Sequence, residues 1–431
     1  MTRKMKDSGV EWIGEIPTHW EMKKVKAFLR ERSEKNHADE EVLSLYRDFG
    51  VIPKHSRSDN HNVTSQDTSS YKFVKKDNVV INKMKAWQGS LAVSKYQGII
   101  SPAYYIYEIK NTAEIVPEFL HYSLRNPLYI QVYKRLSAGL RVGQWDLNKS
   151  EFNSLLYPIP SPEVQLKIVN FLNEKIVFID QIIEETQQSI EEIKKYKQAL
   201  ITETVTKGLD KNVEMKDSRI EWVEEIPEGW DLLKLKYIAN INGRIGYRGY
   251  TTNDIVDKGE GAISLSPSNI IDSKLNLESA TYISWDKYEE SPEIKVINND
   301  IIFCKTGSGY GKCGIFTNVE FPSTINPQLV IIRMRQGNPS YLNYFLNSTI
   351  AQYQVETIVG GSTMPTISQE KLLSMNIIWP DLNSQNEIVD YLDEQFYKLH
   401  LLIKEKEVMI TELESYKKSL ICEYVTGKKE V

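Results

Sequence analysis

Two long stretches of the chain carry apolar residues in a single stripe, and most positions between these residues are polar. The apolar residues recur at steps of three and four, or their sum, which is the heptad pattern of a helix that packs along another helix. The first stripe consists of Ile168, Leu172, Ile176, Ile179, Ile183, Ile190, Ile193 and Leu200. The second consists of Ile388, Leu392, Phe396, Leu399, Ile403, Ile410, Leu413 and Leu420. Both stretches are therefore predicted to be long amphipathic helices.

The first stretch has no proline or glycine between residues 163 and 207. One helix of about 45 residues, roughly 65 Å long, can therefore form there. Its stripe needs an apolar partner, and the equivalent stripe of the second stretch supplies one. We expect the helices to pair antiparallel within the chain, and because a globular segment precedes each helix, this pairing relates the two segments by a pseudo-two-fold axis. A coiled coil that joins two copies of the chain is the alternative.

The segments before each helix contain short apolar runs that are broken by loops of Gly, Asn and Ser. Residues 78–82, 98–109 and 329–334 have the composition of strands. The predicted fold class is therefore α+β, with two α/β domains separated by an antiparallel pair of long coiled-coil helices.

An internal repeat supports this organisation. The segment MKDSGVEWIGEIPTHWEMKKVK, which starts at Met5, returns from Met215 as MKDSRIEWVEEIPEGWDLLKLK, with twelve identities at an offset of 210. The helical stretches match at an offset of 220, as KYKQALITETVT does with SYKKSLICEYVT. A repeat of this kind defines the architecture. We place the first domain at residues 1–159, the first arm at 160–210, the second domain at 211–379 and the second arm at 380–431.

Composition narrows the class of protein. No apolar run reaches the roughly 20 residues that span a bilayer, and the N-terminus lacks the apolar core of a secretory signal. A cytoplasmic location is therefore predicted. The three cysteines (Cys304, Cys313 and Cys422) fit reduced thiols, and the six scattered histidines indicate no metal site.

The formal net charge of −5 hides an uneven distribution. Residues 21–151 hold 21 basic and 15 acidic side chains, a balance of +6, whereas residues 231–371 hold 13 and 14. The helical stretches are acidic. A basic first domain favours a nucleic-acid partner despite the acidic total.

Two segments of the first domain carry side chains suited to DNA. Lys83, Lys85, Trp87 and Gln88 follow a predicted strand. Lysine can bind phosphate or guanine, glutamine can pair with adenine, and tryptophan can stack. A hairpin with a core tryptophan and solvated lysines is the alternative. A glycine-containing loop adds Arg141, Gln144 and Trp145, and its counterpart in the second domain offers Ser362 and Thr363.

The second domain contains the glycine-rich segment IIFCKTGSGYGKCGIF, which exposes Lys305, Ser308, Tyr310 and Lys312 on a predicted turn. It is not a nucleotide-binding loop, because Gly307 is separated from Gly311-Lys312 by three residues rather than four and a cysteine replaces the hydroxyl residue. A structural hairpin without function remains the alternative. The chain also lacks Ser-His-Asp, zinc-binding and adenine-methyltransferase patterns, so no catalytic residues are predicted. Asn126-Pro127 instead indicates a helix cap followed by the first helical residue.

These features together resemble the specificity subunits of type I restriction-modification systems, and the resemblance covers nearly the whole chain. It rests on the duplicated MKDSGVEWIGEIPTHW segment, on the arm endings ALITETVTKGLD and SLICEYVTGKK, and on the order of domain then arm, twice. The segment INKMKAWQGSLAVSKYQGIISPAYYIYEI resembles the recognition-domain core of that family and adds Ser101 as a candidate contact. The match is weaker in the second domain, where Asn326 ends the segment that replaces the Ser-Pro-x-Tyr turn.

The resemblance implies a non-catalytic DNA-binding subunit in which each domain reads half of a bipartite target and the arms fix the unread spacer. It also implies two methyltransferase subunits and restriction/translocase subunits as partners, with S-adenosylmethionine, ATP and Mg bound by those partners and no cofactor bound by this chain. The alternatives are a self-sufficient restriction-methylation enzyme or nucleotide hydrolase, and a coiled-coil tether without DNA specificity.

Overall fold

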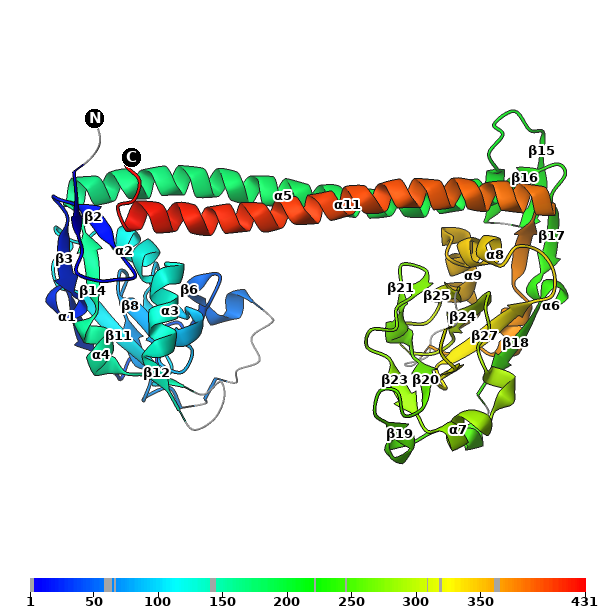
Figure 1. Ribbon diagram of the computed structural model, residues 1–431, viewed down its shortest axis with the longest axis horizontal. Helices are drawn as coiled ribbons and strands as arrows, with labels where there is room; N and C mark the ends of the chain where they lie inside the picture. The colour runs from blue at the N-terminus through cyan, green and yellow to red at the C-terminus, as the bar shows by residue number, and fades with distance from the viewer. Residues whose placement is uncertain are drawn as a thin grey trace. The chain divides into compact units, whose positions relative to one another are not determined.

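The structure is a computed structural model that describes residues 4–57, 64–65, 67–139, 145–220, 222–244, 246–307, 309–317, 320–359 and 365–431. The chain divides into two compact units. Unit 1 comprises residues 1–186 and 407–431, and unit 2 comprises residues 187–406. Each unit therefore contains one mixed domain and one part of each long helix (Figure 1).

The two arms are the single helices α5 (Pro162–Lys207) and α11 (Leu382–Val425), of 46 and 44 residues. In unit 1, the start of α5 packs on the end of α11, where the rings of Phe171 and Tyr424 lie 4.6 Å apart. In unit 2, the end of α5 packs on the start of α11, where Lys197 Nζ lies 4.7 Å from the centre of the Phe396 ring. The start of each helix thus meets the end of the other, so the predicted antiparallel pairing is confirmed (Figure 1).

Unit 1 is built on a four-stranded antiparallel sheet in the order β4-β11-β8-β9, beside the hairpin β5-β6 and the pair β7-β10. Its strands are β1 (Met5–Asp7), β2 (Glu15–Pro17), β3 (Glu21–Lys24), β4 (Leu29–Arg32), β5 (Leu43–Tyr46), β6 (Gly50–Pro53), β7 (Lys72–Val74), β8 (Val79–Asn82), β9 (Leu91–Val93), β10 (Gly98–Ile100), β11 (Tyr104–Ile109), β12 (Ser137–Ala138), β13 (Asp146–Leu147) and β14 (Leu156–Ile159). Its shorter helices are α1 (Val25–Phe28), α2 (Pro117–Leu124), α3 (Pro127–Arg135) and α4 (Lys149–Ser154).

Unit 2 has a larger β component, with a six-stranded sheet in the order β18-β27-β24-β25-β22-β21 and a four-stranded sheet in the order β19-β23-β20-β26. Its strands are β15 (Met215–Ile220), β16 (Val223–Pro227), β17 (Asp231–Lys234), β18 (Ala239–Gly243), β19 (Ile255–Val256), β20 (Ala262–Leu265), β21 (Ile270–Ile271), β22 (Lys274–Leu275), β23 (Thr281–Ile283), β24 (Asp300–Cys304), β25 (Cys313–Phe316), β26 (Ser323–Ile325), β27 (Leu329–Met334) and β28 (Asn376–Trp379). Its shorter helices are α6 (Leu235–Ile238), α7 (Trp285–Glu289), α8 (Pro339–Leu346), α9 (Thr349–Val359) and α10 (Gln369–Leu373).

Local sequence signals account for several of these boundaries. Helix α3 begins at Pro127, and the side chain of Asn126 accepts a hydrogen bond from Leu128 N, as predicted. The β-rich run 98–109 forms two strands in different sheets, because the chain turns between them through a hydrogen bond from Tyr104 N to Ser101 O.

The repeated segments that start at Met5 and Met215 pack on the ends of the arms in both units. In unit 1, Gly427 follows α11 with φ +70°, and a side chain there would meet Pro17 and the buried Trp20. In unit 2, Gly208 follows α5 with φ +75° and lies against Trp230 in the same way. Only glycine combines the left-handed backbone of these helix ends with so close an approach of tryptophan.

A buried glutamine near the start of each arm ties that arm to its domain. Gln165 Oε1 accepts from Val116 N at 2.8 Å, while its Nε2 donates to Glu114 O and Pro160 O, each at 2.8 Å. Gln385 Oε1 accepts from Asn338 N and its Nε2 donates to Pro380 O, again at 2.8 Å.

No helix in the described ranges is both long and apolar enough to cross a membrane.

Candidate nucleic-acid interface

The first candidate loop joins β8 to β9 in unit 1 and contains one turn of 3₁₀ helix, Ala86–Gln88. Lys85 and Gln88 are exposed on this loop, so both can reach a ligand. Trp87 is half-buried, and its Nε1 donates to Met84 O at 3.0 Å, which closes the loop on itself. This tryptophan is therefore partly structural while the lysine and the glutamine remain free of the core.

The segment at β13 lies directly beside this loop. Leu147 N donates to Lys83 O at 2.9 Å, and the ring of Trp145 lies 5.0 Å from that of Trp87. Lys83 Nζ also lies 3.7 Å from a carboxylate oxygen of Asp146. The two segments that were separate candidates in the sequence thus form one surface.

Unit 2 repeats this arrangement with different side chains. The hairpin β24-β25 carries the loop, and Ile367 N donates to Lys305 O at 2.8 Å, matching the bond between Leu147 and Lys83. The hydroxyls of Thr306 and Thr366 lie 2.7 Å apart, and these two residues stand at the positions of Met84 and Asp146 in unit 1. On the same loop Lys312 is exposed, whereas Tyr310 is half-buried and packs on the core.

The comparisons with known proteins point to one group of proteins. The family model described as the type I restriction modification DNA specificity domain matches residues 227–412. The type I restriction enzyme MjaVIII specificity subunit of Methanocaldococcus jannaschii is 24% identical over 433 residues, covering 96% of this chain and 94% of that protein. The putative MjaX specificity subunit of the same organism is 24% identical over 438 residues, covering 97% and 96%. Along nearly its whole length the chain is similar to type I restriction enzyme specificity subunits.

Two solved structures share its fold along nearly the whole chain. One comes from work on the complex assembly and conformational transition of the type I R-M system, with a TM-score of 0.70 and 14% identity, covering 96% of this chain and 99% of the other. The HsdS subunit from Thermoanaerobacter tengcongensis has a TM-score of 0.53 and 14% identity, covering 96% and 98%. Because both structures are only 14% identical to this chain, these similarities show the fold alone.

Two further candidate residues occupy equivalent turns. Ser101 Oγ accepts from Ala103 N at 3.4 Å, and Asn326 Oδ1 accepts from Gln328 N at 3.0 Å. Each turn leads into the strand that pairs with the loop-bearing strand, so these side chains shape the turns beside the loops. Asn326 is buried, whereas Ser101 is partly exposed. The remaining candidates, Arg141, Gln144, Ser308, Ser362 and Thr363, lie outside the described residues.

A group of lysines in unit 1 was missed by the sequence analysis. Lys72 Nζ donates to Tyr104 O at 2.6 Å, and burial lowers the pKa of this amine, helped by the nearby charges of Lys83 and Lys149. Lys149 Nζ lies 2.9 Å from a carboxylate oxygen of Glu31. The basic balance of residues 21–151 indicated surplus cations, but only the fold gathers them beside the loop that bears Lys83.

In the parts of the chain that the structure describes, no group of three His, Cys, Asp or Glu side chains could hold a metal ion.

Proposed function

We propose that this specificity subunit selects the DNA sequence for a type I restriction-modification enzyme, with each domain reading one half of a bipartite, interrupted target. The observation that best supports this proposal is the repeated loop. The same main-chain hydrogen bond holds Lys83 to Leu147 in unit 1 and Lys305 to Ile367 in unit 2. A shared scaffold with different polar side chains suits two readers of different base sequences.

The proposal assigns chemistry to the partners and recognition to this chain. The arms would fix the length of the unread spacer and dock two methyltransferase subunits. S-adenosylmethionine, ATP and Mg would be bound by the methyltransferase and restriction/translocase subunits. Because only the first domain is basic, we expect weak DNA binding by the isolated chain and strong binding by the assembled enzyme.

A domain exchange tests the function most directly. Residues 211–379 are replaced by the corresponding domain of a relative with a different target, and the methylated sites are sequenced in a host that supplies the methyltransferase subunits. We expect one half of the target to change and the other half to stay the same. An unchanged target would support a protein tether without DNA specificity and would reject the proposal.

The proposed role of the arms in setting the length of the DNA spacer is tested by insertion. Seven residues added after Thr186 in α5 and seven after Lys406 in α11 preserve the heptad register and lengthen each helix by about 10.5 Å. At about 3.4 Å per base pair, the preferred spacer should grow by about three base pairs. The matched control adds seven residues between Gly208 and Glu214, outside both helices, and should leave the spacer unchanged. A spacer that stays fixed after the arm insertions would contradict this part of the proposal.

A further inference from the structure

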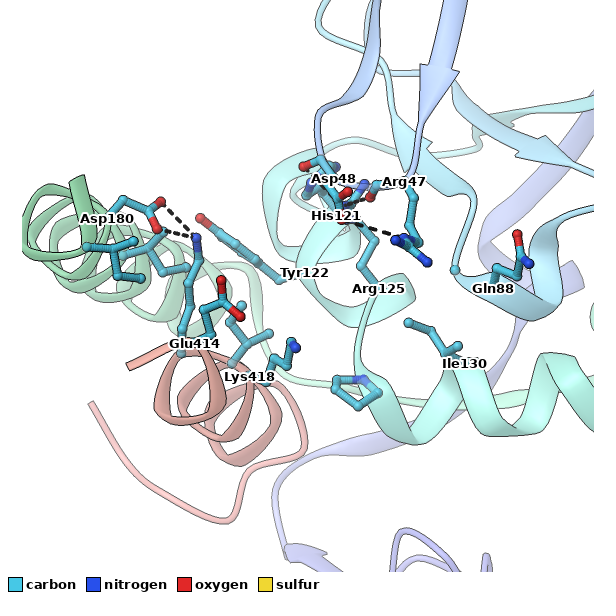
Figure 2. Close-up of a pocket in the computed structure, with 16 residues that line it drawn as sticks. Arg47, Asp48, Gln88, His121, Tyr122, Arg125, Ile130, Asp180, Glu414 and Lys418 are labelled. Atoms are coloured by element: carbon cyan, nitrogen blue, oxygen red, sulfur yellow. Dashed lines mark hydrogen bonds and ion pairs between the residues drawn. The ribbon is translucent and has the colours of Figure 1, made fainter. Parts of the chain in front are cut away.

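Unit 1 contains a pocket of about 780 Å³ between its domain and its helical arms. The walls come from the turn of the β5-β6 hairpin, the loop end at Gln88, helix α2 with the residues after it, and both arms (Figure 2). Gln88 belongs to the proposed DNA-reading loop, so the pocket is continuous with that surface.

The repeat explains why this pocket is open. At the same junction in unit 2, Gln198 Nε2 donates to Asn347 O at 2.5 Å, and Thr349 N donates to Thr202 Oγ1 at 3.0 Å. These contacts join arm and domain directly.

In unit 1 this junction carries different residues. Lys418 stands at the position of Gln198, and Arg125 at that of Asn347. Pro127 replaces Thr349 and has no N–H to donate. Two cations therefore line the place where unit 2 has the neutral side chains of Gln198 and Asn347 (Figure 2).

The side chains around the pocket carry an excess of one positive charge. Asp180 is paired with Lys417 at 2.6 Å, and Asp48 lies 3.6 Å from Arg47. Glu414 is the remaining lining carboxylate, so four cations face three anions. His121 adds no charge at neutral pH, because burial lowers its pKa to about 3.

Arg125 is the better-defined of the two cations. Its Nη2 donates to Arg47 O, which fixes the guanidinium at the hairpin turn. Its Nη1 is buried and has no hydrogen-bond partner among the described residues. A buried donor without a partner destabilises a protein unless a ligand satisfies it, and the cost is higher for a charged group.

We propose that the pocket takes one phosphate of the DNA backbone, held between Arg125 of the domain and Lys418 of helix α11. This inference rests on the proposed function. Arginine and lysine are the usual phosphate ligands, and backbone contacts accompany base contacts in protein–DNA interfaces. The phosphate completes in unit 1 the junction that Gln198 and Thr202 complete in unit 2. Docking of the first domain on its arm is thereby coupled to DNA.

The test restores the neutral junction of unit 2 in unit 1. Chains with Arg125→Asn and Lys418→Gln, singly and together, are assembled with the methyltransferase subunits, and binding to the methylated target duplex is measured from about 50 to 200 mM salt. The double variant should bind roughly ten-fold more weakly at low salt. Its slope of log affinity against log salt should fall in magnitude by about one, with the methylated sequence unchanged. Lys167→Gln, which removes an exposed charge outside the pocket, is the matched control.

Neutral methylphosphonates placed one at a time along the duplex then locate the phosphate. A methylphosphonate at one position should weaken binding by the wild-type enzyme and have no effect on binding by the double variant. The exposed Lys418→Gln change alone should reproduce part of this result even if the double variant folds poorly.

Three results would overturn the inference. They are an unchanged salt slope with no such position, a loss of methyltransferase assembly in place of DNA affinity, and a loss of inorganic phosphate binding without any effect on DNA. A wild-type enzyme that binds no specific DNA would instead reject the proposed function itself.

Discussion

Units 1 and 2 share their main-chain framework and differ in the side chains that this framework presents. In both units, the carbonyl oxygen of a loop lysine accepts a main-chain hydrogen bond from a segment farther along the chain. The turns at Ser101 and Asn326 also contain the same main-chain hydrogen bond. Around these bonds, Thr306 and Thr366 stand at the positions of Met84 and Asp146. Because main-chain bonds do not depend on residue type, the loop can change its chemistry without losing its position. The comparison explains how one scaffold can serve two targets.

The buried glutamines provide the largest expected effect on this shared framework. Gln165→Leu keeps the side-chain volume but leaves Val116 N and two carbonyls without partners, so we expect a loss of about 2 to 4 kcal/mol in unfolding free energy. Gln385→Leu breaks two of the corresponding bonds and should cost about 1 to 3 kcal/mol. Equilibrium unfolding in urea measures both.

The exposed Gln181→Leu on the same helix is the control for these glutamines and should change stability by less than about 0.5 kcal/mol. Equal, small losses at all three positions would mean that the glutamines do not tie the arms to the domains.

A difference in pH dependence should separate the two units. Burial and the neighbouring charge of Arg125 lower the pKa of His121 to about 3, and its Nδ1 accepts from Val93 N. The unfolded chain binds this proton near pH 6.5, so stability is fully present above about 6.5 and is lost as the pH falls toward 3. Between pH 7 and pH 5 this group should cost about 2 kcal/mol.

Unit 2 has Asn343 at the equivalent position, and His121→Asn should remove this pH dependence. Urea unfolding at pH 7 and pH 5 measures the difference between wild type and variant. If both lose the same stability on acidification, His121 is not the group responsible.

The arms could be predicted from sequence because their signal is local and periodic. The heptad stripe and the absence of proline and glycine determine α5 almost to its observed ends, Pro162 and Lys207. The cap at Asn126 and strand β27 were equally accessible from neighbouring residues. Pairing within the chain followed from the duplication.

The candidate surface could be predicted only in part, because its contacts join residues that are far apart in sequence. The ion pair between Lys83 and Asp146 spans 63 positions, and the two tryptophans are 58 apart. The periodic pattern of apolar residues in the sequence does not reveal pairs that are so far apart. The additional sheet β19-β23-β20-β26 of unit 2 was not predicted either, since its strands are mostly two to four residues long and lie below the length at which alternation is recognisable.

The smallest expected effect concerns the arm pairing itself, where the units again differ. Lys417 Nζ donates to both carboxylate oxygens of Asp180 in unit 1, at 2.6 and 2.7 Å, whereas the equivalent Lys197 in unit 2 lies over the Phe396 ring. The Asp180 side chain is 52% exposed, so Asp180→Asn should cost less than about 1 kcal/mol, and the cost should vanish near 1 M salt because exposed ion pairs are screened.

Lys197→Gln is the matched variant in unit 2. It removes a cation–π contact worth a similar free energy, but one formed with a ring and not with a second charge, so its cost should persist at high salt. Urea unfolding at low and high salt distinguishes the two. A salt-independent loss of more than about 2 kcal/mol for Asp180→Asn would contradict a screened surface pair. It would mean that this carboxylate holds Lys417 in place against the adjacent charge of Lys418, and that the electrostatics of the unit 1 pocket extend into the arm pairing.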